Sequence, residues 1–410
     1  MTQGGTLLAG VNVLDLSRVL AAPHCTMALG ELGARVIKVE HVRVGDETRT
    51  WGPPFVEGES AYYLAVNRNK QSVALDLATP VAQKVVRRLA LSWADIVVEN
   101  FKAGDLERFN LGLADLRAAQ PRLITASIRG YPIGDDRPGY DFVIQGAGGL
   151  MSITGPQQGP PSKVGVAVAD LFAGSWLLSG ILAALYERER SGRGQHVSVS
   201  LFDSQLAMLA NVASSYLVTG RPSARYGNAH AQLVPYEVFG CKDGEITVGV
   251  GNDHQFAAVC KVLGHPEWCT DERYATNPQR VLHRQQLVAE MGAALGQRFA
   301  SEVLSALNAA GVPCGPIRSV GDALESPEAA LGGAVTHLEH AKIRDLPQVR
   351  LPWRFSRSDA SPRTAPPLHG EHTAEVLAEA GLSDEEIADA LRSGAATVMV
   401  GQRRTSGRRS

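Results

Sequence analysis

The chain lacks the features that mark secreted, membrane-spanning and nucleic-acid-binding proteins. Its 410 residues include five cysteines, which occur singly and in no CxxC pair. Such usage fits unpaired thiols in a reducing compartment rather than a disulfide framework. The net charge is only −2, which argues against a nucleic-acid partner. No uncharged apolar stretch approaches the roughly 18 residues of a bilayer span, so no membrane partner is expected.

The chain ends carry little information about targeting. The N-terminal stretch MTQGGTLLAG has no basic region followed by a long apolar run, so we expect no secretory signal. We therefore predict a cytoplasmic protein, and a mitochondrial matrix location stays open if a presequence has been removed. The basic end, residues 396–410, is expected to be a flexible tail.

What the sequence does contain is an alternation of strand and helix patterns through its first half. Strands are expected at residues 11–15, 35–40, 72–77, 96–99 and 122–127, and helices at 23–33, 80–92 and 113–120. Alternation at this spacing predicts an α/β fold with a parallel sheet covered on both faces. Residues 246–250, 253–263, 283–298 and 300–310 predict one strand and three helices of a smaller α+β domain.

Asp170 stands out because it follows an apolar run, residues 164–169, that we interpret as a strand, and precedes a long apolar helix at 171–188. An aspartate at such a junction is often only a helix N-cap. It can also be a carboxylate nucleophile, whose negative charge the amides of the helix end would stabilise. The pattern leaves both interpretations open, and the two roles can coexist.

Two further patterns have an ordinary and a functional interpretation. Glycines in Gly249-Val250-Gly251 can simply form a turn, or they can form a lid whose amides face a reacting acyl group. Basic residues near expected strand ends can be solvated, or they can line a groove for a phosphorylated ligand. The basic residues in such positions are Arg18, Lys38, Arg68, Lys70, Lys102 and Arg108.

Several familiar motifs are missing. The segment Leu29–Gly33 lacks a GxGxxG sequence, and no GxSxG elbow is present. His369 and His372 have loose metal-ligand spacing but no third ligand, so no metal site is predicted. Residue chemistry alone therefore indicates an α/β enzyme without specifying its reaction.

An ordered series of local segments is more specific, and it resembles the class III CoA-transferase family, which includes formyl-CoA transferase and carnitine CoA-transferase. The likeness is greatest to its succinate–hydroxymethylglutarate (glutarate) CoA-transferase branch. The segments are VLDLSRVLAAP (13–23), LGARVIKVE (32–40), GDETRTWGPPF (45–55), NRNKQSVALDL (67–77), ADIVVENF (94–101), RPGYDFVIQG (137–146), GLMSITG (149–155), GVAVADLFAG (165–174), SGRGQHV (191–197), GNDHQF (251–256), GVPCGPI (311–317) and GEHT (370–373).

The resemblance implies a large parallel-sheet domain built from both chain ends, a small domain between them, and a homodimer of interlocked subunits. We accordingly expect residues 1–224 and 326–395 in the large domain, 225–325 in the small domain and 396–410 as the tail. The resemblance also implies that no permanent cofactor is bound, and that a coenzyme A thioester is the substrate together with a carboxylic acid.

The resemblance implies roles for individual residues. Asp170 is the expected nucleophile, and Gly249 and Gly251 form the glycine loop. The expected CoA-binding residues are Arg18, Lys38, His41, Lys70, Asn100, Phe101 and Arg108. Two positions depart from the family pattern, because His41 replaces a common arginine and Gln71 replaces a common second basic residue. Both departures concern CoA contacts and not the reaction class.

The same fold also includes α-methylacyl-CoA racemases, which carry a histidine where this chain has Tyr140. A racemase needs a second acid–base group opposite its aspartate, so the tyrosine favours the transferase. A racemase or isomerase and a non-catalytic acyl-CoA-binding protein remain the alternatives. Branch-specific similarity predicts succinyl-CoA as donor and a short dicarboxylic acid as acceptor. The candidate partners of the unreacted carboxylate are Arg49, Arg225 and His230.

Overall fold

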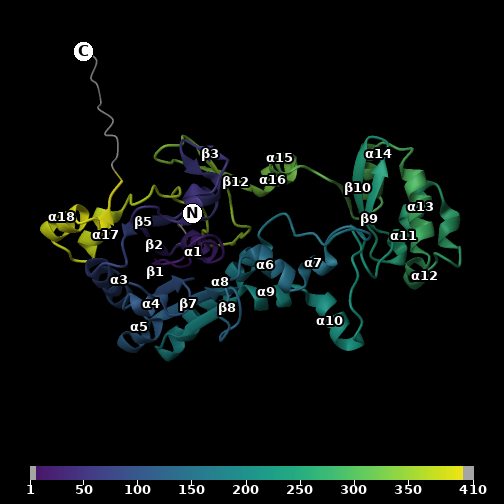
Figure 1. Cartoon of the computed structure of the whole chain (residues 1–410). Coiled ribbons are helices and arrows are strands. Elements are labelled where there is room, and N and C mark those ends of the chain that lie inside the picture. The colour runs from purple at the N-terminus through teal and green to yellow at the C-terminus, as the bar shows by residue number, and fades with distance from the viewer. Residues whose placement is uncertain (1–5, 400–410) are drawn as a thin grey trace, which may run out of the picture. The chain divides into compact units, whose positions relative to one another are not determined.

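The computed structural model describes residues 6–399 and contains two compact units (Figure 1). The larger unit comprises the chain up to Gly149, Gly165–Ala213 and the chain from Glu328 onward. The smaller unit comprises Leu150–Val164 and Ser214–Pro327. Residues 150–164, 214–224 and 326–327, which we expected in the large domain, thus belong to the smaller unit. The basic residues 402–410 lie outside the described part of the chain.

A seven-stranded sheet forms the centre of the larger unit, and all its strand pairs but one are parallel. In spatial order the strands are β14 (Ala396–Thr397), β5 (Lys70–Leu75), β2 (Arg35–His41), β1 (Asn12–Asp15), β6 (Ile96–Glu99), β7 (Ile124–Arg129) and β8 (His196–Ser200). Strand β14 pairs antiparallel with β5. The expected tail boundary at residue 396 was therefore wrong, because these two residues complete the sheet edge.

Helices cover both faces of this sheet. Successive strand residues point to opposite sides, and apolar residues on both sides must be buried. Val13 faces one apolar cluster and Leu14 faces the other. The first face packs against α1 (Ala21–Glu31), α6 (Asp141–Ala147), α8 (Val168–Ser191) and α9 (Leu201–Met208). The second face packs against α3 (Pro80–Ser92), α4 (Asp105–Arg108), α5 (Leu113–Ala119), α17 (Thr373–Glu379) and α18 (Asp384–Arg392). The mixed α/β fold predicted from the sequence is confirmed.

The strand order reverses between β1 and β6. The chain leaves β1 toward β2 on one side, whereas β6 and β7 lie on the other side. Loops that follow these strands therefore diverge, and they leave a crevice at the carboxyl ends of β1 and β6. Ligands of open α/β sheets bind at such a crevice.

Helix α8 begins earlier than the sequence pattern indicated. Residues 164–169 do not form a strand; the helix starts at Val168, and Asp170 lies in its first turn. By length and composition α8 could cross a membrane. In this fold it is a core helix, because Ala173, Leu177 and Ile181 are fully buried against α1 and the sheet.

Smaller elements surround the large sheet. They are the 3-10 helix η1 (Glu47–Thr50), the hairpin β3 (Phe55–Val56) and β4 (Glu59–Ser60), helix α2 (Ala61–Val66), helix α16 (Pro327–Gly332), of which all but Pro327 belongs to the larger unit, and the hairpin β12 (Val335–Leu338) and β13 (Leu346–Val349). Helix α10 (Ala210–Thr219) crosses the boundary between the two units at residue 213.

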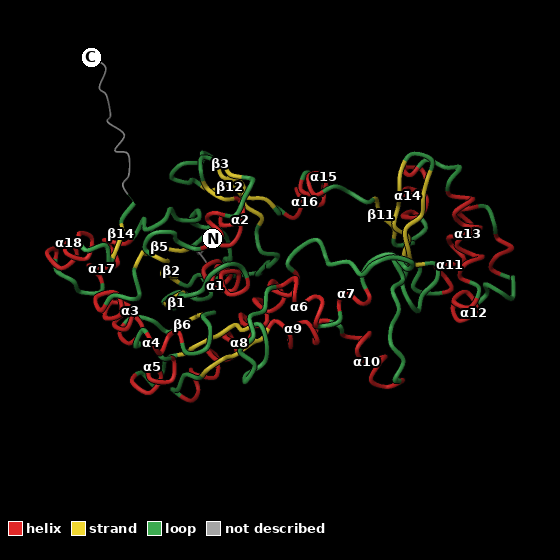
Figure 2. Tube along the Cα trace, viewed as in Figure 1, coloured by secondary structure: helices red, strands yellow, loops and turns green. Residues whose placement is uncertain are grey.

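The smaller unit is an antiparallel three-stranded sheet with its own helical layer (Figure 2). Its strands run in the order β11 (Cys314–Pro316), β10 (Gly244–Gly249) and β9 (Tyr236–Cys241). Its helices are α7 (Leu150–Ile153), α11 (Asp253–Leu263), α12 (Asn277–Leu282), α13 (Arg284–Leu295), α14 (Ala300–Ala309) and α15 (Val320–Leu324), with the 3-10 helix η2 (Pro266–Cys269). Phe256, Leu287 and Val303 belong to its separate apolar core.

Candidate active site

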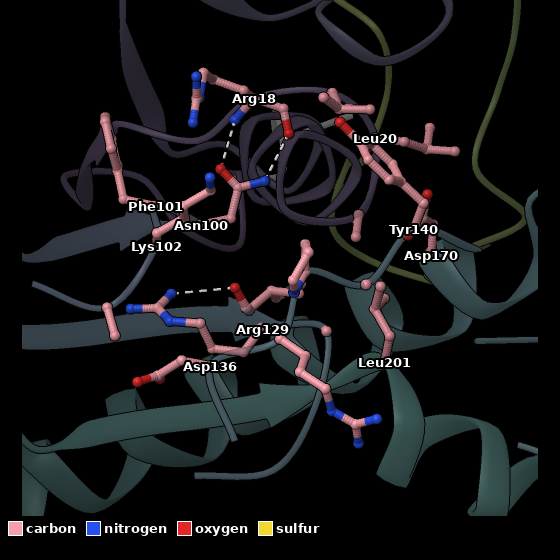
Figure 3. Close-up of a pocket in the computed structure, with 18 of the residues that line it drawn as sticks. Arg18, Leu20, Asn100, Phe101, Lys102, Arg129, Asp136, Tyr140, Asp170 and Leu201 are labelled. Carbon is pink, nitrogen blue, oxygen red and sulfur yellow. Dashed lines mark hydrogen bonds between the residues drawn. The ribbon is translucent and has the colours of Figure 1, made fainter. Parts of the chain in front are cut away.

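A cavity of about 200 Å³ lies at the point where the strand order of the large sheet reverses. Loops after β1, β6 and β7 and the first turns of α8 and α9 line it. Two hydrogen bonds join the first two loops: the Arg18 N–H donates to Asn100 Oδ1 at 2.9 Å, and Asn100 Nδ2 donates to the Arg18 carbonyl at 2.7 Å (Figure 3). Asn100 thus fixes the shape of the crevice.

Asp170 is the carboxylate that lines this cavity from α8. The N-cap residue Ala167 cannot cap the helix with its side chain, and Asp141 of α6 supplies the missing acceptor. Asp141 Oδ1 accepts the Ala169 N–H at 2.8 Å, and its Oδ2 accepts Gln145 Nε2 at 2.7 Å. Asp170 is therefore not the cap, which leaves its carboxylate available for chemistry.

The surroundings of Asp170 disfavour its charged form. Burial and, to a smaller extent, the neighbouring Asp141 carboxylate raise the pKa of Asp170 from 3.8 to about 7. Among residues 6–399 no cation forms an ion pair with it. A carboxylate that lacks solvent and a countercharge is a stronger base and nucleophile than a solvated one, and strongly shifted pKa values cluster at functional sites.

Cationic groups of the larger unit surround the same cavity. Arg18 contacts Glu47 at 3.3 Å and lies 5.0 Å from the centre of the Phe101 ring. Arg129 pairs with Glu99 at 2.8 Å. Lys102 is exposed and has no ion pair within the described chain. The set Arg18, Lys102, Arg129 and Arg137 lines the cavity and can receive an anionic ligand such as a phosphate ester.

The structure thus brings together five residues chosen from the sequence, which are Arg18, Asn100, Phe101, Lys102 and Asp170. Sequence reasoning missed Arg129, Arg137 and Asp141 as site residues. Arg129 ends β7, so its position was detectable only once that strand was known to neighbour β6. Asp141 lies in the segment RPGYDFVIQG, which carried the family resemblance but no assigned role.

Lys38 and Lys70 do not reach this cavity, which corrects the expectation that they contact CoA. Both side chains are fully buried in ion pairs: Lys38 Nζ lies 2.9 Å from Asp46 Oδ2, and Lys70 Nζ lies 3.1 Å from Asp15 Oδ2. Burial lowers the pKa of Lys70 to about 8 although Asp15 opposes this change. Neither ammonium group is accessible to a ligand phosphate.

Two further predicted CoA residues, Arg108 and His41, lie outside the cavity lining. Arg108 of α4 is exposed and pairs with Asp105. His41 is exposed at the end of β2, where its Nδ1 accepts the Arg43 N–H at 3.2 Å. A contact between either residue and CoA stays a prediction.

Two of the three candidates for binding a substrate carboxylate have partners of different kinds. Arg49 is largely buried and bidentate to Glu40, at 2.7 and 2.8 Å. Glu40 therefore neutralises its charge internally, which disfavours its predicted role. Arg225 of the smaller unit donates to the Gly159 carbonyl at 2.7 Å and to the Pro156 carbonyl at 3.3 Å. These neutral partners leave its positive charge uncompensated.

The third candidate, His230, also belongs to the smaller unit. Its Nδ1 accepts the Gln232 N–H at 3.0 Å, and its ring centre lies 5.3 Å from that of Tyr236. Nε2 is the nitrogen that could meet a ligand.

The glycine loop offers fewer amides than the sequence suggested. The Gly249 N–H donates to the Pro313 carbonyl and the Val250 N–H to the Pro235 carbonyl, each at 2.9 Å. Gly249 is thus occupied by backbone bonds of the smaller unit, which corrects its expected role as a donor. The Gly251 N–H donates to a side chain, Gln255 Oε1, at 2.8 Å. A side-chain acceptor can rotate away without disrupting a strand.

The paired histidines near the C-terminus serve the fold. His369 Nε2 lies 3.0 Å from the His41 carbonyl, and His372 Nδ1 accepts the Ser72 N–H at 3.3 Å. Within residues 6–399 no group of three potential ligands is arranged to hold a metal ion.

The cavity at the switch point, with a carboxylate of raised pKa in its wall, is the candidate active site of an α/β enzyme. The family model described as CoA-transferase family III matches residues 8–373, and the chain belongs to this family.

Curated relatives share this assignment over nearly their full lengths. Human succinyl-CoA:glutarate CoA-transferase is 41% identical over 392 residues, which cover 94% of this chain and 89% of the relative. Succinate–glutarate CoA-transferase of Agrobacterium fabrum is 44% identical over 382 residues, covering 91% and 95%. The crystal structure of a CAIB/BAIF family protein from Brucella suis matches with a TM-score of 0.83 and 41% identity, covering 92% of this chain and 100% of that one.

The raised pKa predicts that Asp170 destabilises the fold at neutral and alkaline pH. A folded pKa of about 7 exceeds the unfolded value of 3.8, so stability is lost as pH rises from about 4 through 7. Asp170→Asn should therefore be more stable than the wild type at pH 8, by about 1 to 4 kcal/mol. Urea unfolding at several pH values measures this, and the gain should shrink toward pH 5. A variant that is equally or less stable at pH 8 would contradict the assignment of an uncompensated charge.

Proposed function

We propose that this enzyme transfers CoA from succinyl-CoA to a short dicarboxylic acid through a covalent intermediate on Asp170. The observation that carries the proposal is an unpaired carboxylate, with its pKa raised to about 7, in a cavity lined by four cationic residues. Family membership supports the reaction class. The names of the human and Agrobacterium relatives support the substrates.

The first half-reaction transfers CoA from the donor to Asp170. A carboxylate oxygen of Asp170 attacks the thioester carbonyl of the donor, the C–S bond breaks, and a mixed anhydride and CoA thiolate form. The thiolate then attacks the aspartyl carbonyl, which gives an aspartyl-CoA thioester and releases succinate. Covalent catalysis divides one difficult exchange into steps between activated groups.

The second half-reaction reverses these steps with the acceptor. Its carboxylate attacks the aspartyl thioester and expels CoA thiolate, which leaves an aspartyl–acceptor anhydride. The thiolate attacks the acceptor carbonyl, so acceptor-CoA leaves and the Asp170 carboxylate is restored. No atom changes its oxidation state, and CoA enters as part of the substrate.

The residues around Asp170 suit these steps. Arg18, Lys102, Arg129 and Arg137 are proposed to bind the phosphates of CoA, because charge-assisted hydrogen bonds from arginine and lysine are strong. We further propose that Gly251, and not Gly249, donates its amide to an oxyanion after Gln255 rotates away.

The racemase alternative lacks a group that it needs. Tyr140 lines the cavity where the related racemases carry histidine, so the chain lacks the imidazole that would serve as their second acid–base group. A racemase would act without an acceptor acid, whereas a non-catalytic binding protein would show no turnover with any acceptor. An assay with succinyl-CoA, with and without glutarate, therefore separates all three functions.

Replacement of the nucleophile should abolish transfer. Asp170→Ala should lower kcat more than about a thousandfold, because the covalent route is lost. CoA binding, measured by calorimetry, and the circular dichroism spectrum should be preserved, since Asp170 supports neither the sheet nor the phosphate contacts. Retention of more than a tenth of the wild-type transfer would refute the role of Asp170.

The acceptor should carry two carboxylates. One reacts with the aspartyl thioester, and burial of the second would be costly without a cationic partner. We propose that Arg225 and His230 remain the candidates for that partner, since Arg49 is neutralised by Glu40. With succinyl-CoA as donor, glutarate should give at least a tenfold higher kcat/KM than butyrate. Equal rates would reject the dicarboxylate preference and leave the transfer chemistry intact.

We also propose that two subunits interlock. Large apolar side chains are exposed in the single chain, among them Leu217, Val218 and Leu331 at 80%, 79% and 92%. Exposed apolar groups of this kind favour a protein interface. Interlocked subunits cannot separate without partial unfolding, so the dimer should persist at nanomolar concentration and its dissociation should coincide with unfolding. Sedimentation that finds a folded monomer at assay concentration would contradict the interlocking.

A further inference from the structure

The segment between β1 and α1 forms one wall of the cavity and has an unfavourable backbone conformation. Arg18, Val19, Leu20 and Ala21 all line the cavity. Val19 has a φ of 71°, in the left-handed region that β-branched residues avoid. Strained residues of this kind persist only where the surrounding structure holds them, and they cluster at functional sites.

The buried ion pair between Lys38 and Asp46 bonds the backbone before Arg18 and at Val19 itself. Lys38 Nζ donates to the Ser17 carbonyl at 2.6 Å and pairs with Asp46 Oδ2 at 2.9 Å. The Val19 N–H donates to the same Asp46 carboxylate at 3.2 Å. The pair therefore connects the residue before Arg18 with the residue after it.

A second buried pair fixes the start of the segment and of α1. Asp15 accepts the Ser17 N–H at 2.9 Å and the Thr26 hydroxyl at 2.6 Å, and it pairs with Lys70. Lys70 Nζ also donates to the Pro23 carbonyl at 2.9 Å. All four charged side chains of the two pairs, which we call the lysine–aspartate network, have no exposed surface.

The segment between β1 and α1 leads directly into a contact with α8, the helix that carries Asp170. A Cβ atom on Gly174 would lie 2.3 Å from the Ala21 carbonyl oxygen, so α8 touches the beginning of α1 at this point. Gly174 follows Asp170 by four residues and shares its helix face. A displacement of the segment would therefore alter the surroundings of the Asp170 carboxylate.

Stability alone does not account for these buried charges. Desolvation commonly offsets the attraction within a buried ion pair, and apolar replacements are often equally stable. The network bonds Ser17 and Val19 of the segment and Pro23 and Thr26 of α1. Its other partners, Thr48 and Asn67, hold Asp46 and Lys70 in place. Such an arrangement suits a role in geometry better.

Given the proposed function, we infer that Lys38 and Asp46, supported by Lys70 and Asp15, are positioning residues for CoA transfer. They hold Ser17–Leu20 in its strained conformation and so set the wall that faces Asp170. The two lysines thus act through the backbone and not by contact with CoA.

The test measures kcat for succinyl-CoA and glutarate in the full-length protein. Asp46→Asn keeps an oxygen for the Val19 N–H but removes the charge that pairs with Lys38, and kcat should fall about 10- to 100-fold. Lys38→Met should do the same where it folds. The matched control is Arg188→Met, which breaks a half-buried pair between Asp95 and Arg188, a residue at the far end of α8. It should lower Tm to a similar extent and leave kcat unchanged.

A double-mutant comparison separates positioning from general support. Glycine adopts a φ of 71° without strain, so the kcat loss caused by Asp46→Asn should be at least threefold smaller in a Val19→Gly background. A kcat within twofold of wild type in Asp46→Asn, an equal loss in Arg188→Met, or an identical loss in both backgrounds would each overturn the inference. A wild-type protein without transfer activity would instead refute the proposed function.

Discussion

The active-site geometry depends on one half-buried carboxylate that has no countercharge among residues 6–399. Asp170 lies in the first turn of a core helix, largely shielded from solvent and beside a second carboxylate, Asp141. These surroundings disfavour its charged form and raise its pKa to about 7. The neighbouring side chains do not neutralise the Asp170 charge. Asp141 accepts hydrogen bonds from Ala169 and Gln145, and Arg18 and Arg129 of the cavity pair with other acids. An ion pair at this place would stabilise the fold and weaken Asp170 as the proposed nucleophile.

The position of this carboxylate follows from the topology of the sheet. Divergence of the chain at β1 and β6 opens the crevice, and the Arg18–Asn100 bonds hold its two sides together. Helix α8 approaches α1 closely because Gly174 has no side chain. The lysine–aspartate network keeps the intervening loop in a conformation that its own sequence disfavours. The strained loop after β1, the packing of α8 on α1 and the strand order of the sheet thus together determine the surroundings of the Asp170 carboxylate.

The alternating sheet, the long apolar helix and the place of Asp170 near the start of that helix could be predicted from the sequence, because periodicity and motif order indicate them directly. The role of Asp170 as nucleophile stays a prediction. The roles of Lys38, Lys70 and Arg49 could not be predicted from the sequence. A basic residue near a strand end looks alike in sequence whether it faces a ligand or a buried acid, and only the register of β2 against β1 and β5 places Lys38 inside. The occupied amide of Gly249 could not be predicted for a similar reason, because the carbonyl that accepts it belongs to Pro313, which is distant in sequence.

The central claim is that Asp170 carries the CoA group during turnover. The most direct measurement mixes the enzyme with succinyl-CoA without acceptor, adds hydroxylamine and locates the modified residue by peptide mass spectrometry. An aspartyl thioester is far more electrophilic than a free carboxylate, so the account predicts one donor-dependent hydroxamate, on the peptide that contains Asp170. No modification, or modification of Asp141 or Asp203 instead, would contradict it.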